Sequence, residues 1–103
     1  TIERLKEKGL VDAIGIQMHL DQNKYTRAPD PKQFKAAIKA FQDLGVAVYI
    51  TEMDVNLNNR KGQDRFLYQS EVYGDILQTY LETNAGNIFS IFGLYDKHSW
   101  LEI

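Results

Sequence analysis

Short apolar segments alternate with longer segments of helical periodicity, and this alternation constrains the fold of the chain most strongly. Residues 12–20, 46–51 and 88–92 are short apolar runs bounded by turn residues, which predicts three buried strands. Between them, residues 31–44 and 63–83 repeat apolar side chains at helical spacing. This order predicts right-handed βαβ units and therefore a parallel sheet.

Helix boundaries are marked by residues with strong local preferences. Residues 1–8 have the pattern of the end of an amphipathic helix, which Gly9 terminates. Asp30 followed by Pro31 is a typical helix start, because an aspartate side chain accepts backbone N–H bonds and proline suits the first turn. Gly45 is expected to end that helix. The polar, turn-rich stretches 21–30 and 54–62 predict loops.

Three parallel strands do not make a complete sheet. They leave two unpaired edges, and strands that are apolar on both faces require cover on each side. A closed barrel meets both demands if the remainder of a longer parent chain supplies the missing strands. The helical pattern that is already present at Thr1 also indicates that these residues belong to a longer parent chain. We therefore expect residues 1–103 to be part of one (β/α)8 domain rather than a complete domain.

Composition bears on the classes of partner and of site that the chain can have. The formal net charge of −2 and the absence of a basic cluster give no support for a nucleic-acid or anionic-membrane partner. No apolar run is long enough to cross a bilayer, and no signal peptide is visible. The chain has no cysteine, so disulfides and thiolate metal sites are excluded.

Polar side chains gather where the predicted strands end. Gln17 and His19 end the first strand, and Glu52 and Asp54 follow the second, each pair two residues apart and therefore on one side of its strand. Neighbouring parallel strands bring their carboxyl ends to one rim, which is where such folds place functional residues. The third strand delivers Phe92, and a loop with Asp96, His98 and Trp100, to the same rim.

These residue types suit the cleavage of a glycosidic bond. A carboxylate such as Glu52 can capture the oxocarbenium-like state of that reaction. A donor such as His19 would stabilise the ionised form of that carboxylate, and Asp54 can hold the imidazole in one tautomer. Trp100 offers an apolar ring for stacking on a sugar.

Three segments carry a resemblance to a known family. Residues 13–20 (AIGIQMHL), 48–55 (VYITEMDV) and 92–100 (FGLYDKHSW) resemble the sixth, seventh and eighth strands of the family 10 glycoside hydrolases, the endo-β-1,4-xylanases. The most specific motifs are T-E-x-D at Thr51 to Asp54 and D-K-x-S-W at Asp96 to Trp100. The resemblance covers nearly the whole chain.

The resemblance implies roles for individual residues. It implies a retaining endo-xylanase without a cofactor or metal, acting on xylan or xylo-oligosaccharides. Glu52 would be the nucleophile, hydrogen-bonded to His19 with Asp54 behind it. Gln17 and Trp100 would contact the sugar in the glycone half of the cleft. Secretion is the localisation that the resemblance implies.

Two departures from the family pattern stand out. Phe92 occupies the position before the glycine of the eighth strand, where the family usually has tryptophan, so the indole donor is missing there. The family's acid/base glutamate follows an asparagine at the fourth strand, and no Asn-Glu pair occurs in these 103 residues. The acid/base is therefore expected in the remainder of the barrel.

Other interpretations stay open at this point. The chain could be a non-catalytic carbohydrate-binding relic, or part of a related barrel β-glycanase acting on glucan or mannan. Gln17 could serve only backbone groups of the rim, and Phe92 could be a core aromatic residue. A metal site formed by His19, Glu52, Asp54 and His98 lacks a ligand-spacing motif. His98 is expected to be a solvated loop residue.

Overall fold

The computed structural model describes residues 1–21, 27–57 and 62–102. The helices and strands are α1 (Ile2–Glu7), β1 (Ala13–Ile16), β2 (His19–Leu20), α2 (Pro31–Asp43), β3 (Ala47–Val55), α3 (Asp64–Thr83) and β4 (Phe89–Ile91), followed by two 3-10 turns, η1 (Asp96–His98) and η2 (Trp100–Glu102). The predicted alternation of helices and strands is confirmed. Residues 22–26 and 58–61, which belong to the predicted loops 21–30 and 54–62, lie outside the described residues.

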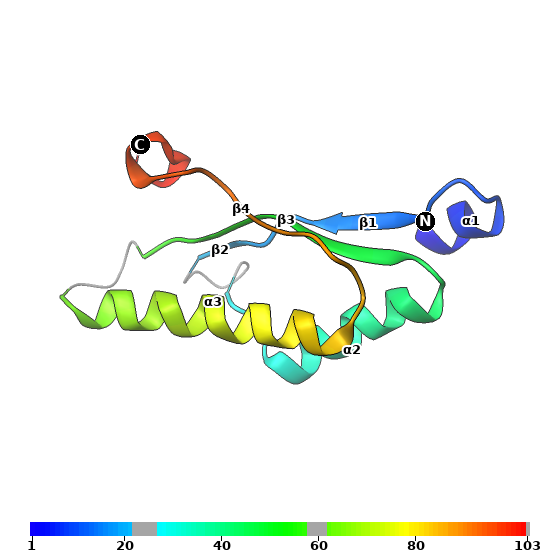
Figure 1. The fold of residues 1–103 in the computed structure, drawn as a ribbon, viewed down its shortest axis with the longest axis horizontal. Coiled ribbons are helices and arrows are strands. Elements are labelled where there is room, and N and C mark those ends of the chain that lie inside the picture. Colours follow the sequence, from blue (N-terminus) through cyan, green and yellow to red (C-terminus); the bar gives the residue numbers. More distant parts are fainter. Residues whose placement is uncertain (22–26, 58–61, 103) are drawn as a thin grey trace.

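Strand β3 is the centre of a parallel sheet. It pairs with β1 and then β2, and it pairs with β4 in the same parallel sense. The prediction that strands consecutive in the sequence lie side by side is therefore confirmed. The carboxyl ends of the strands lie at one end of the sheet, and the C-terminal turns begin at that same end (Figure 1).

In the described part of the chain, helices cover one face of this sheet. In Figure 1, α2 and α3 lie together beneath the strands, while α1 lies beyond the start of β1. No helix within the described residues lies over the opposite face. None of the helices in this part of the chain is long and apolar enough to span a membrane.

The hydrophobic core lies between β3 and the two covering helices. Val48, Ile50 and Met53 of β3 are fully buried, and Ile38 of α2 and Ile76 of α3 pack against them. Burial of such side chains is the main source of stability in a two-layer unit, at about 1.5–3 kcal/mol for each. The covered face of the sheet therefore holds the fold together.

Local interactions define the helix ends as predicted. The Asp30 side chain accepts hydrogen bonds from the backbone N–H groups of Lys32 (2.9 Å) and Gln33 (3.3 Å). Pro31 is the first residue of α2, and Gly45 after the helix has a φ of +79°, a conformation that favours glycine.

The return from α3 to β4 brings backbones unusually close together. The buried Tyr80 hydroxyl donates to the Val48 carbonyl oxygen at 2.6 Å. A side chain at Gly86 would collide with that same carbonyl and with the Tyr80 hydroxyl, so only glycine fits.

Strand β3 is longer than predicted and carries a bulge. The prediction ended this strand at residue 51 and began a loop at 54, but pairing with β2 and β4 extends the strand to Val55. The register shifts between Ile50 and Met53, so β3 has one residue more than its partners there. The backbone N–H groups that donate toward the β1 edge also change at this bulge. Before it the donor is the odd-numbered Ala47, and after it the donors are the even-numbered Glu52 and Asp54.

The first predicted strand is interrupted. Residues 12–20 were expected to form one strand, but β1 ends at Ile16 and β2 begins at His19. Met18 between them has a φ of +65°, which is rare for a residue other than glycine. Its left-handed backbone breaks regular pairing opposite the β3 bulge.

The molecule is more open than a self-contained domain of its length. Its radius of gyration is 15.1 Å, against about 13 Å for a compact chain of about 100 residues. Its accessible surface is 7490 Å², against about 6,000 Å² expected for a compact protein of this mass. Large apolar side chains stay exposed, among them Leu94, Ile91 and Leu81. The structure therefore has the character of part of a larger unit.

Candidate active site

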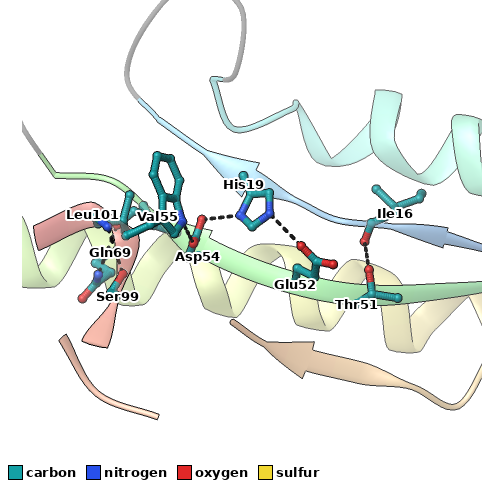
Figure 2. Close-up of polar contacts among 10 residues, drawn as sticks. Ile16, His19, Thr51, Glu52, Asp54, Val55, Gln69, Ser99 and Leu101 are labelled. Carbon is teal, nitrogen blue, oxygen red and sulfur yellow. Dashed lines mark hydrogen bonds and ion pairs between the residues drawn. The ribbon is translucent and has the colours of Figure 1, made fainter. Parts of the chain in front are cut away.

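Three polar side chains form a continuous row at the carboxyl end of β3. His19 Nδ1 lies 2.9 Å from Asp54 Oδ1, and His19 Nε2 lies 3.0 Å from Glu52 Oε2. Figure 2 shows the imidazole ring between the two carboxylates, joined to each by a dashed line. The juxtaposition of His19, Glu52 and Asp54 at one rim, predicted from strand adjacency, is therefore what the structure contains.

The bulge in β3 places the two carboxylates on one face. Val48 and Ile50 point to the helices, so regular alternation would send Glu52 the same way. The extra residue lets Glu52 lie on the uncovered face and returns Met53 to the core. The neighbouring Thr51 hydroxyl donates to the Ile16 carbonyl oxygen (3.4 Å), which ties the bulge to β1.

The row has a gradient of burial. The Asp54 side chain is 5% exposed, that of His19 27% and that of Glu52 34%. The carboxylate at the outer end of the row is thus the one open to a ligand. Among the described residues, Glu52 Oε1 has no hydrogen-bond partner, and this oxygen can attack an electrophile.

The two carboxylates decide the charge of the imidazole. Ionised carboxylates only accept hydrogen bonds, so both ring nitrogens of His19 must donate when both neighbours are ionised. Partial burial lowers the pKa of His19, but the hydrogen bonds and negative charges of Asp54 and Glu52 outweigh this effect. The pKa of His19 therefore lies above its ordinary value of 6.5, so the imidazolium form persists to higher pH than in a free histidine.

Two aromatic rings stand edge-on to the imidazole. The Phe92 ring centroid lies 5.2 Å from that of His19 with an interplanar angle of 79°, and the Trp100 ring lies 5.8 Å away at 87°. Both rings remain about half exposed, at 45% and 47%. Phe92 therefore does not have the burial expected of a core aromatic residue.

Trp100 also makes a polar contact that the sequence analysis did not predict. Its indole Nε1–H donates to Asp54 Oδ2 at 2.6 Å. The sequence held one signal for it, because an indole carries an N–H donor that usually finds a partner where the ring is buried. Separation by 46 residues hid which acceptor that would be.

The remaining candidates lie outside the row. Gln17 contacts Glu52 only through the backbone, because its carbonyl oxygen accepts from the Glu52 N–H at 3.1 Å. The side chain of Gln17 is exposed. His98 is exposed and pairs with Tyr95, whose hydroxyl oxygen lies 3.2 Å from His98 Nε2. Among the described residues, no group of three His, Cys, Asp or Glu side chains is arranged to hold a metal ion.

A cavity of about 260 Å³ lies beside the row, between β4, α3 and the C-terminal turns. Asp54, Tyr73, Phe92 and Asp96 are among its lining residues. Burial, together with the charges of Asp54 and Asp96, raises the pKa of Tyr73 above its ordinary value of 10. Tyr73 is partly buried and packs against the core from this position.

Proteins named as xylanases resemble the chain over nearly all of its length. Endo-1,4-beta-xylanase B of Thermotoga neapolitana is 36% identical over 102 residues, which cover 97% of this chain and 28% of the relative. A beta-1,4-xylanase of Dictyoglomus thermophilum is 35% identical over 114 residues, covering 97% and 30%. The chain thus spans less than a third of the length of these relatives.

Solved structures match the fold as well. An intracellular xylanase from Thermoanaerobacterium saccharolyticum superimposes with a TM-score of 0.80 at 29% identity, covering 96% of this chain and 30% of the other. Xylanase10C from Cellvibrio japonicus, solved with xylopentaose, gives 0.82 at 29% identity, covering 98% and 22%. These neighbours are TIM barrels, and the present chain has the parallel α/β arrangement of a part of one.

The model of the family described as glycosyl hydrolase family 10 matches residues 1–103. With the parallel sheet and the similar xylanases in agreement, this chain belongs to glycosyl hydrolase family 10.

Proposed function

We propose that residues 1–103 form the C-terminal part of a (β/α)8 barrel, with its sixth to eighth strands, in a retaining endo-β-1,4-xylanase. The sixth strand corresponds to β1 and β2, the seventh to β3 and the eighth to β4. The uncovered face of the sheet, the open shape and the share of the relatives' length that the chain spans support this proposal. In a closed barrel, the uncovered face becomes the interior and the strand ends become the rim of the substrate cleft.

The observation that carries the proposal is the position of Glu52. Its carboxylate lies at the outer end of the row, one oxygen held by His19 and the other without a partner among the described residues. A nucleophile needs this combination, because one oxygen fixes the orientation while the other meets the anomeric carbon.

In the first chemical step, Glu52 Oε1 attacks the anomeric carbon. The bond from that carbon to the leaving sugar's oxygen breaks, and an acid outside this chain protonates the oxygen. The product is a covalent glycosyl ester of Glu52. The retaining mechanism places the acid carboxyl about 5 Å from the nucleophile.

In the second step, the former acid, now a base, removes a proton from water. The resulting hydroxide attacks the anomeric carbon from the opposite side and releases Glu52 as a carboxylate. The His19 imidazolium stabilises the carboxylate as it leaves, because its Nε2–H points at Oε2. Two inversions leave the anomeric configuration unchanged.

The substrate class rests on the relatives. The similar proteins are xylanases, and one solved neighbour holds xylopentaose. The exposed faces of Phe92 and Trp100 flank the row and offer apolar surfaces to a pyranose ring. Gln17 lies at the same strand end with an exposed amide, and we assign it to sugar binding with them.

A mechanism-based inactivator tests the proposal. The complete protein that contains this chain is incubated with a 2-fluoro-xylobioside carrying a good leaving group, and the labelled peptide is identified by mass spectrometry. We expect the label on Glu52, and in a separate assay hydrolysis of an unmodified xylo-oligosaccharide should release a product with retained configuration. Labelling of another carboxylate would reject the nucleophile assignment.

Turnover and binding assays, taken together with the labelling, separate the alternatives. If the protein turns over glucan or mannan faster than xylan, that polysaccharide and not xylan is the substrate class. Sugar binding without labelling or turnover would support a non-catalytic binding protein instead.

A further inference from the structure

We propose that Trp100 is a positioning residue, which acts through its indole N–H on Asp54 and thereby holds His19 in line with Glu52. The inference deepens the proposed function, on which its kinetic part rests. Binding a sugar ring does not require the N–H, so this is a second role for Trp100.

Asp54 is the most buried member of the row, and each of its oxygens has one side-chain partner. Oδ1 lies 2.9 Å from His19 Nδ1, and Oδ2 accepts from Trp100 Nε1 at 2.6 Å. A buried polar group that loses a partner incurs a desolvation cost, so both bonds are needed to hold this carboxylate in place. The Trp100 bond therefore sets the plane of the carboxylate and with it the direction of Oδ1.

The indole can only donate, and this property directs the rest of the row. The indole N–H donates to Oδ2 and stabilises the negative charge that the two carboxylate oxygens share, which favours Oδ1 as an acceptor toward His19. His19 Nδ1 must then carry the proton in that bond. With Nδ1 donating to Asp54, Nε2 is aligned with Glu52 Oε2, and the ring contacts of Phe92 and Trp100 oppose rotation of the imidazole.

Short-range contacts of the C-terminal turns hold Trp100 itself. The Ser99 hydroxyl accepts from the Leu101 N–H at 3.2 Å, and the Ser99 N–H donates to the Asp96 carbonyl oxygen at 2.8 Å. The segment that follows β4 is thus coupled to a nucleophile on β3. Within the described residues, Asp54 and Glu52 are the charged groups that act on the titration of His19.

The test uses Trp100→Phe in the complete protein, which keeps an aromatic ring and removes the donor. The titration of His19 is followed by nuclear magnetic resonance with histidine labelled by nitrogen-15, and the signal is assigned by its loss in His19→Gln. We expect the midpoint of His19 to fall, because a less well held Asp54 stabilises the imidazolium less. We also expect kcat to fall about tenfold.

A double-mutant cycle with Asp54→Asn isolates the route of action. If Trp100 acts through the Asp54 carboxylate, Trp100→Phe changes neither the His19 titration nor kcat further in the Asp54→Asn background. A pure sugar-contact role would instead raise KM equally in both backgrounds. Tyr95→Phe, an exposed aromatic substitution in the same segment, is the matched control and should leave the His19 midpoint unchanged.

An unchanged His19 midpoint in Trp100→Phe would overturn the inference, as would effects that simply add in the cycle. The titration needs no catalytic activity. A protein without xylanase activity but with the expected titration shift would therefore reject the proposed function and keep the coupling of Trp100 to His19.

Discussion

The two faces of the sheet differ in composition and in what they contribute. On the covered face, Val48, Ile50 and Met53 pack against helices and are wholly buried. On the uncovered face, His19 and Glu52 are partly exposed and linked by hydrogen bonds rather than by packing. One strand, β3, thus supplies both the core that stabilises the fold and the carboxylates of the site.

The difference teaches how one strand can serve both purposes. Strict alternation would force a choice between a core residue and a rim residue at each position. The bulge between Ile50 and Met53 changes the alternation where the core ends and the site begins. Substitutions on the uncovered face should therefore change activity with little effect on stability, and substitutions on the covered face should do the reverse.

The largest effect is expected for Glu52→Gln in the complete protein. Loss of the nucleophile should lower kcat by a factor on the order of 10⁴ or more. The melting temperature should change little, because the side chain is partly exposed and a change there costs below about 1 kcal/mol. Glu71→Gln, an exposed carboxylate on α3, is the matched control for activity. Near-normal turnover of Glu52→Gln would contradict the claim that the uncovered face carries the activity.

On the covered face, Ile50→Ala should act on stability alone. Removal of a wholly buried side chain leaves a cavity and should cost about 2–5 kcal/mol of unfolding free energy. Ile50→Val should cost only about 0.5–1.5 kcal/mol. Both are measured by denaturant unfolding, with kcat determined where the protein is fully folded. A large loss of kcat in Ile50→Val would mean that the two faces are not independent.

The smallest effect should be the pH dependence that His19 adds to stability. Its pKa is raised in the folded state above the ordinary 6.5, so its stabilising contribution is complete below pH 6.5. The contribution is lost as the pH rises through the folded-state pKa, where the imidazolium deprotonates. Melting temperatures across this range should show the loss in the wild type and not in His19→Gln. Identical pH profiles for the two proteins would contradict the imidazolium assignment.

Much of the fold could be predicted from local patterns. Asp30 and Pro31 start α2 because their preferences act within one turn. The apolar runs became strands because their length and composition suit a buried sheet. The extension of β3 to Val55 could not be predicted, because it depends on pairing with Leu20 of a distant segment. Met18 likewise has a backbone conformation that its own type disfavours.

The candidate site could likewise be predicted only in part. The spacing of Glu52 and Asp54, and of Gln17 and His19, indicated which residue types share a rim. The spacing did not reveal that a bulge is required for Glu52 to face away from the helices. It also did not reveal the hydrogen bond from Trp100 to Asp54.

The sequence alone determined the order of helices and strands, the helix ends and the identity of the polar residues at the strand ends, because these follow from preferences and periodicities within a few residues. Only the tertiary structure decided the register of β3, the face on which Glu52 lies and the partner of each Asp54 oxygen. Those features depend on contacts between residues more than 30 positions apart, as for His19 with Glu52 and Asp54, which local preferences do not encode.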